Sequence, residues 1–261
     1  KLLSIPDESL LYHSVRNGIS TWLMARREIT LARHLRRYRW EDFKTPEEIR
    51  QFIVHAIESA ELKKVKGRII NFNPKLVDSN RYISRLGKGS FGGKGRGMAF
   101  LSNFIENVDF KKLIPNLPIA IPKTAIIGVD EFDHFIDNNN LSEIAYSDKS
   151  YEEIKEAFIQ AELTPCLKEK LRNYLEVMKK PLAVRSSGLF EDSLSQPFAG
   201  VYSTYLIPNN DADMVRRALE LEKAIKLVFS SIFTEGSRAY FRAIGSMIEE
   251  EKMAVIIQEV V

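Results

Sequence analysis

Cysteine is almost absent from this chain of 261 residues, and its scarcity limits how the chain can fold. Cys166 is the single cysteine, so no disulfide can form within the chain. That composition is typical of a reducing compartment, and we predict a cytoplasmic location. Apolar runs are also short, and none approaches the roughly 20 residues that a membrane-spanning helix needs. The opening KLLSIPDESLLYHS lacks both the apolar stretch of a signal peptide and an initial methionine, so we expect a piece of a longer protein.

Neither sign of charge dominates the composition. Lys and Arg number 38 against 35 Asp and Glu, a formal net charge of +3. So small an excess gives no reason to expect general binding to polyanions, and we predict no nucleic-acid partner. Hydrophobic residues make up 44% of the chain, which is ordinary for a globular protein with a sizeable core. The histidines show no metal-ligand spacing, and we predict no metal site within the chain; they are His13, His34, His55 and His134.

The first sixty residues carry a helical pattern. Between residues 10 and 38, apolar side chains recur at steps of three and four and predict one apolar face; they include Leu11, Val15, Ile19, Trp22, Ile29 and Ala32. Arginines make this stretch basic, and we interpret it as a solvated face or an interdomain contact, because aromatic residues do not alternate with them as in a base-stacking platform. Thr45-Pro46-Glu47-Glu48 then predicts the capped start of a helix that runs to about Lys64.

After Gly67, strand-like segments alternate with helical ones. The predicted strands cover residues 68–74, 119–128, 181–187, 201–207 and 253–261. The predicted helices begin near Gly97 and cover about 130–137, 150–163, 165–179, 211–233 and 235–245. Strands mixed with helices behind a helical segment predict an α/β (α+β) fold.

The segment GKGSFGGKGRG, residues 87–97, combines six glycines with three basic side chains. Its glycines include the G-x-G-x-x-G spacing of a dinucleotide-binding turn, but the preceding DSNRYISRL is too polar for the buried strand that such a turn follows. A P-loop is also excluded, because Lys94 precedes Gly95 where that motif has Ser or Thr. Two interpretations stay open. The segment is either a loop whose backbone N–H groups and cations hold an anion, or a flexible solvated turn.

A second candidate site lies in AVRSSGLFEDSLSQPFAGVYSTYLIPN, residues 183–209. We expect Arg185 at the end of a buried strand, followed by two serines whose hydroxyls suit phosphate oxygens. We expect Glu191 and Asp192 to pair with Arg185 or with another basic group, and they are better placed to orient Arg185 than to bind magnesium. The alternative is an ordinary hairpin with a structural salt bridge at the arginine.

VRSS, ED and FAG at these spacings resemble the nucleotide-binding domain of the phosphoenolpyruvate synthase and pyruvate phosphate dikinase family. Further segments resemble this family in the same order: GGKG (92–95), IPKTAIIGVDEFDHFI (121–136), SSIFTEGSRAYFRAIG (230–245) and AVIIQEVV (254–261). The resemblance covers residues 81–261 and implies the first part of an ATP-grasp-like fold, truncated at its C-terminal end. Residues 1–80 are then a helical N-terminal segment or linker.

The resemblance also implies the site. It implies Lys94 and Arg185 as the catalytic residues of this chain, acting as a cationic clamp on the phosphates of ATP. The other residues that it implies in nucleotide binding are Gly92, Gly93, Gly95, Ser186, Ser187, Gly200, Gln258, Glu259 and Val261. Mg²⁺ is implied as a cofactor, with ligands in a second half of the fold that we expect after this chain.

For the full-length protein, the resemblance implies a phosphotransferase of the pyruvate, water dikinase type. A phosphoryl group would pass from ATP to a histidine in a separate domain and then to pyruvate. The implied partners are ATP and the remaining domains of the same polypeptide, with no nucleic acid and no membrane. We expect the isolated chain not to complete the transfer. Two alternatives stay open, namely a dikinase relative with another acceptor and a noncatalytic nucleotide-sensing or interaction module.

Overall fold

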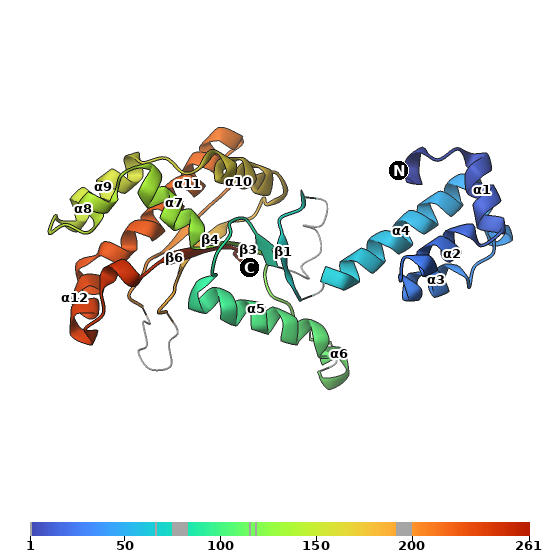
Figure 1. Cartoon of the computed structure of the whole chain (residues 1–261), viewed down its shortest axis with the longest axis horizontal. Helices are drawn as coiled ribbons and strands as arrows, with labels where there is room; N and C mark the ends of the chain where they lie inside the picture. The colour runs from blue at the N-terminus through green and yellow to red at the C-terminus, as the bar shows by residue number, and fades with distance from the viewer. Residues whose placement is uncertain (1, 66, 75–82, 115, 118, 192–199) are drawn as a thin grey trace. The chain divides into compact units, whose positions relative to one another are not determined.

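The computed structural model describes residues 2–65, 67–74, 83–114, 116–117, 119–191 and 200–261. The chain divides into two compact units, Lys1–Val65 and Lys66–Val261 (Figure 1). The domain boundary predicted at residue 80 falls inside the second unit, after its first strand. Asp192, one of the two carboxylates predicted to orient Arg185, lies outside the described residues.

The N-terminal unit is a group of helices packed around two small apolar clusters. Its elements are η1 (Leu2–Ser4), α1 (Asp7–Val15), α2 (Gly18–Ala25), α3 (Ile29–Leu35), η2 (Trp40–Asp42) and α4 (Pro46–Val65). The buried apolar residues are Leu10, Leu23, Leu31, Ala32, Ile49, Ile53 and Ala56. The predicted cap of α4 is confirmed, because the Thr45 hydroxyl oxygen accepts the Glu48 N–H at 3.2 Å.

The single apolar face predicted between residues 10 and 38 is wrong. Asn17 and Arg27 have φ of 56° and 63°, and residues in this left-handed region end a right-handed helix. The stretch therefore forms three short helices in place of one continuous pattern. Trp22, which the pattern placed on the apolar face, is 53% exposed. After each of these two residues the next helix has a new axis and presents its side chains in a new direction. A single helical periodicity therefore cannot describe the side chains of all three helices.

The second unit is built on a mixed β-sheet. Within the described residues it has six strands in the order β1-β2-β3-β6-β4-β5. They are β1 (Ile69–Asn71), β2 (Ile83–Arg85), β3 (Thr124–Ile127), β4 (Leu182–Gly188), β5 (Thr204–Ile207) and β6 (Met253–Glu259). β1, β2 and β3 are parallel, whereas β6 is antiparallel to both of its neighbours, β3 and β4. β6 therefore joins a parallel half of the sheet to an antiparallel hairpin of β4 and β5.

β2 is a strand that the sequence pattern did not predict. Ile83 and Ser84 are almost completely buried, and the strand is hydrogen-bonded on both sides, to β1 and β3. Pairing through the backbone does not depend on side-chain polarity, so a strand with one isoleucine is stable at this central position. The glycine-rich segment does therefore follow a buried strand, contrary to our expectation.

Helices cover one face of the sheet over the main core. They are α7 (Asp130–Asn138), α9 (Tyr151–Gln160), α10 (Pro165–Val177), α11 (Met214–Ser230) and α12 (Glu235–Ile244), with the short elements α8 (Ser142–Ala145), η4 (Ser231–Phe233) and η5 (Ile248–Glu250) (Figure 1). The capping box predicted at Ser150 is confirmed, since Ser150 and Glu153 exchange side-chain to backbone hydrogen bonds. The predicted elements are present, but several are shorter than predicted: β3 begins at Thr124, five residues late, and β5 begins at Thr204, three residues late.

The opposite face of the sheet is covered by α5 (Gly92–Asn107), which leads into α6 (Phe110–Leu113). Helix α5 packs through Met98 and Ala99 on a small cluster of Ile83, Ile126 and Ile256. These isoleucines come from β2, β3 and β6, so they hold the helix over the centre of the sheet. The candidate site lies where this helix begins.

Candidate functional site

The glycine-rich segment leads directly into α5. The helix begins at Gly92, five residues before the predicted start at Gly97. Gly92-Gly93-Lys94-Gly95 form the first turn, where backbone N–H groups lie beyond the reach of the helix's own carbonyls. A solvated turn is therefore the wrong interpretation for residues 92–97. The N-terminal end of this helix of 16 residues carries a partial positive charge, which favours an anion.

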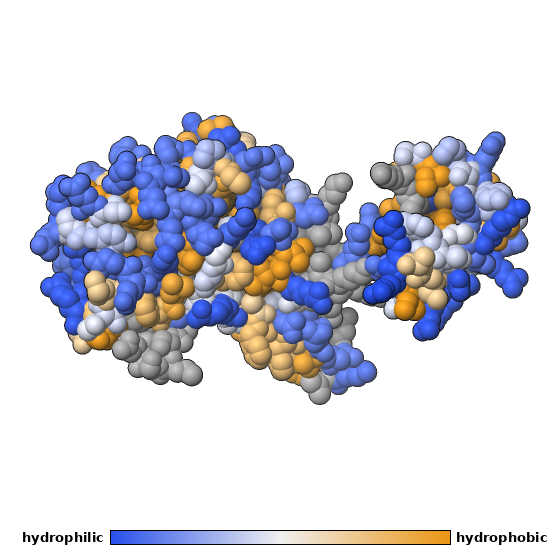
Figure 2. All heavy atoms as spheres, in the orientation of Figure 1, coloured by the Kyte–Doolittle hydropathy of each residue, from blue (hydrophilic) through white to orange (hydrophobic). Residues whose placement is uncertain are grey.

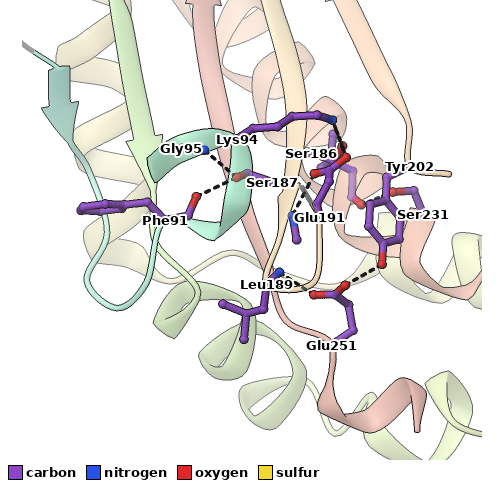
Figure 3. Close-up of polar contacts among 12 residues, drawn as sticks. Phe91, Lys94, Gly95, Ser186, Ser187, Leu189, Glu191, Tyr202, Ser231 and Glu251 are labelled. Atoms are coloured by element: carbon purple, nitrogen blue, oxygen red, sulfur yellow. Dashed lines mark hydrogen bonds and ion pairs between the residues drawn. The ribbon is translucent and has the colours of Figure 1, made fainter. Parts of the chain in front are cut away.

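Gly92 allows the start of α5 to approach β4 closely. Its φ is +67°, and a Cβ there would lie 1.9 Å from the carbonyl oxygen of Ser187. The Ser187 hydroxyl donates to the Phe91 carbonyl at 2.7 Å and accepts the Gly95 N–H at 2.9 Å (Figure 3). Ser187, which the family resemblance placed near phosphate, therefore uses its hydroxyl to fasten the first turn of α5 to the strand.

The residues before α5 are held against the connection between β3 and α7. The Val129 N–H donates to the Ser90 carbonyl at 2.9 Å, and the Asp130 N–H donates to the Lys88 carbonyl at 3.3 Å. A Cβ on Gly128 would lie 2.0 Å from that Lys88 carbonyl oxygen. The start of α5 is thus fixed by contacts on two sides, from β4 and from the β3–α7 connection.

Lys94 extends from α5 to the loop that follows β4. Its Nζ lies 3.3 Å from Ser186 Oγ and forms an ion pair with Glu191 (Figure 3). The Glu191 side chain is 1% exposed, and it also accepts the Gly188 N–H at 3.0 Å. Of the two partners left open for Glu191, Arg185 or another basic group, the structure shows the second. Its partner is the other cation of the predicted clamp.

Arg185 lies in the middle of β4, not at the end of a strand as predicted. Its Nη1 donates to Gln258 Oε1 on β6 at 3.3 Å, and Gln258 Nε2 donates to Thr124 Oγ1 on β3 at 3.2 Å. Alternate residues of a strand share a face, so Arg185 is on the same face as Ser187 and therefore on the side of α5. Three neighbouring strands thus present a row of polar side chains beside the start of the helix.

The structure brings some of the predicted nucleotide-binding residues together and leaves others apart. Lys94 contacts Ser186, and Ser187 fastens the first turn of α5 to β4, the strand that also carries Arg185. Glu259 instead forms an ion pair with Lys180 at 2.6 Å, and Val261 is 97% exposed. Gly200 is exposed with φ of +76°, and no contact within the described part of the chain joins it to the two cations.

Sequence reasoning missed two buried residues that hold both ends of the connection between β4 and β5. Glu251 accepts the Leu189 N–H at 2.6 Å and the Tyr202 hydroxyl at 2.6 Å (Figure 3). Burial raises the pKa of the Glu251 carboxyl, and burial together with this carboxylate raises the pKa of the Tyr202 phenol. Glu251 belongs to the acidic run IEEEK, which has no pattern that separates a buried carboxylate from exposed ones.

The donor set at this junction fits a polyanion. Lys94, Arg185 and the N-terminal end of α5 all supply positive charge or N–H donors. In the described residues, no group of three or more His, Cys, Asp and Glu side chains is placed to hold a metal ion. Among the helices that the structure describes, none is long and apolar enough to span a membrane.

Comparison with known proteins shows the family. A model of the pyruvate phosphate dikinase AMP/ATP-binding domain matches residues 88–261, which is more than half of the chain. The chain belongs to this family. The matched range contains α5, β4 and β6, and therefore the whole junction that holds Lys94 and Arg185. The pyruvate phosphate dikinase resemblance that the motifs predicted is confirmed.

One curated protein is also similar to part of this chain. It is the "Uncharacterized phosphotransferase YvkC" of Bacillus subtilis (strain 168), which is 24% identical to this chain over 143 residues. The alignment covers 54% of this chain and 16% of the relative. The aligned part of this chain therefore spans only a small part of that phosphotransferase.

Proposed function

We propose that this domain binds ATP with its phosphates at the N-terminal end of α5, between Lys94 and Arg185. The observation that carries the proposal is the packing of the Gly92–Gly95 turn against the strand that bears Arg185. Two cations and a helix N-terminus from neighbouring elements support the proposal. Arg185 is half-buried and the Lys94 side chain is 27% exposed, so both are held by the protein while they stay accessible to a ligand.

This arrangement suits phosphoryl transfer, in which the protein mainly positions the phosphates and neutralises their charge. Lys94 and Arg185 supply that neutralisation from two different elements. The N-terminal end of α5 adds a partial positive charge beside them. Mg²⁺, when bound, supplies further neutralisation of the phosphate oxygens.

We further propose that the domain serves a phosphotransferase that passes a phosphoryl group from ATP to a histidine in a separate domain, and from there to pyruvate. Family membership and the phosphotransferase name of the relative support this role.

Titration calorimetry with ATP tests the site. Replacing Lys94 or Arg185 with alanine removes a charge-assisted contact of about 1.5–3 kcal/mol, so we expect the ATP Kd to rise by about 10-fold or more. Matched controls are Lys112→Ala and Arg216→Ala, whose side chains are 84% and 73% exposed on other helices. Wild-type affinity in both site variants would show that the phosphates bind elsewhere.

A further inference from the structure

Glu191 is a buried carboxylate at the edge of the proposed site. An ionised carboxylate is costly to bury unless it is paired and hydrogen-bonded. Its Oε2 accepts the Gly188 N–H at 3.0 Å, and its Oε1 contacts the Ser186 hydroxyl at 3.5 Å as well as Lys94 (Figure 3). Donors from the strand end and from the serine hold this carboxylate independently of the lysine. The Glu191 carboxylate is therefore held in place by the backbone and Ser186, and Lys94 forms an ion pair with it.

Lys94 gains a defined position from this attachment. A lysine side chain carries its strongly hydrated ammonium on a flexible chain of four carbons, so the ammonium samples many positions when it is unrestrained. An ammonium has three N–H donors, and Glu191 and Ser186 account for two of them. The Lys94 side chain is still 27% exposed, and its ammonium has one donor beyond these two partners.

We propose that Glu191 is a positioning residue that fixes the Lys94 ammonium and presents its third N–H to the nucleotide phosphates. The inference rests on the proposed ATP site and assigns a role to a carboxylate that touches no phosphate itself. It makes the position of one cation of the proposed clamp depend on a residue that follows the end of β4. Loss of the carboxylate frees the lysine without removing it.

The negative charge of Glu191 predicts an opposite effect on ATP binding. A carboxylate beside a phosphate site repels phosphate, so its loss would strengthen ATP binding if repulsion dominated. Positioning and repulsion therefore predict opposite changes for Glu191→Gln, which keeps the shape and the acceptor for the Gly188 N–H but removes the charge. This opposition makes the variant decisive.

The first measurement is ATP binding by calorimetry to the 261-residue chain. We expect Glu191→Gln to raise the ATP Kd by about 10-fold, since a charge-assisted contact is weakened when its lysine loses its place. The matched control is Glu222→Gln, which alters another buried carboxylate beside a lysine, Lys168, whose side chain is also 27% exposed. Unchanged or tighter ATP binding in Glu191→Gln, or an equal loss in Glu222→Gln, overturns the proposal.

The second measurement needs no nucleotide and separates this inference from the ATP site itself. The rate at which a mild acetylating reagent modifies Lys94 is followed by peptide mass spectrometry. We expect Glu191→Gln to raise that rate several-fold and Glu222→Gln to leave it unchanged, because a fixed ion pair protects an amine from reaction. An unchanged rate in Glu191→Gln overturns the positioning role. If the rate rises while wild type fails to bind ATP, the lysine restraint stands and the ATP site is wrong.

Discussion

Replacing Gly92 with alanine is the sharpest test of how the candidate site is built. The new Cβ would lie 1.9 Å from the Ser187 carbonyl oxygen and 2.5 Å from Ser187 Oγ, and neither backbone can give way cheaply. A non-glycine residue at φ of +67° costs about 1 kcal/mol. Separating α5 from β4 also breaks the two hydrogen bonds of the Ser187 hydroxyl, at about 1 kcal/mol each. We therefore expect the variant to lose about 3 kcal/mol of stability in the second unit.

The matched control is Gly97→Ala in the same helix. A Cβ at Gly97 meets no atom within 4 Å, so alanine there should gain up to about 1 kcal/mol from its higher helix propensity. Both tryptophans, Trp22 and Trp40, lie in the first unit, so their fluorescence does not report the second unit. Urea-dependent hydrogen exchange of peptides from β4 and α5 provides the readout. A loss below about 1 kcal/mol in Gly92→Ala, or an equal loss in Gly97→Ala, would refute the close-approach argument.

Three further predictions concern the second unit. Arg217 is 5% exposed and donates to a side-chain oxygen and two backbone carbonyls at 2.6–2.8 Å. Arg217→Lys should therefore lower the free energy of unfolding in urea by about 2–3 kcal/mol, whereas the exposed control Arg216→Lys should change it little. Equal effects of the two substitutions would contradict this prediction. Burial raises the pKa of Glu251 above its ordinary value of 4.5, so the folded state holds this proton longer than the unfolded state. Stability from this group is therefore full below pH 4.5 and falls as pH rises through the raised pKa, and melts over a pH series should show that Glu251→Gln lacks the fall. Gly245 ends α12 with φ of +69°, so Gly245→Ala should lower the free energy of unfolding by about 1 kcal/mol. The control is Gly236→Ala, which should cause no such loss because a Cβ there meets nothing within 4 Å.

Most of the second unit could be predicted from local patterns. β6 is an apolar run and β4 begins with Leu-Ala-Val. Ser150 and Pro165 mark helix starts by side-chain chemistry that acts within a few residues. β2 could not be predicted this way, because its stability comes from pairing with β1 and β3 rather than from its own side chains. The prediction of one apolar face in the first unit failed for another reason. Asn17 and Arg27 have left-handed backbone conformations, and they divide the periodic stretch into separate helices.

The site was predictable in its members but not in its pairings. Lys94 and Arg185 stand out by motif, and both lie at the junction of α5 and β4. The partner of Lys94 is 97 residues further along the chain, and only the packing of the helix on the strand decides that Glu191 meets the lysine rather than the arginine. The role of Glu251 could not be predicted from the sequence for the same reason, because the burial of its side chain depends on the assembled sheet.

The order of the sheet has a consequence for how the chain folds as it is made. β6 lies between β3 and β4, yet it is synthesised after both, and Thr124 and Gln258 meet across a separation of 134 residues. Until Met253–Glu259 has emerged, β3 and β4 each expose an unpaired edge, which is a template for pairing with a wrong strand. Contacts between residues so distant in sequence form slowly, because a long loop must be closed before they stabilise anything. A nascent chain arrested before Met253 should therefore be cleaved by protease at β3 and β4, and resistance there would contradict this order of assembly. Synthesis of one seven-residue strand turns two separate half-sheets into a single cooperative domain.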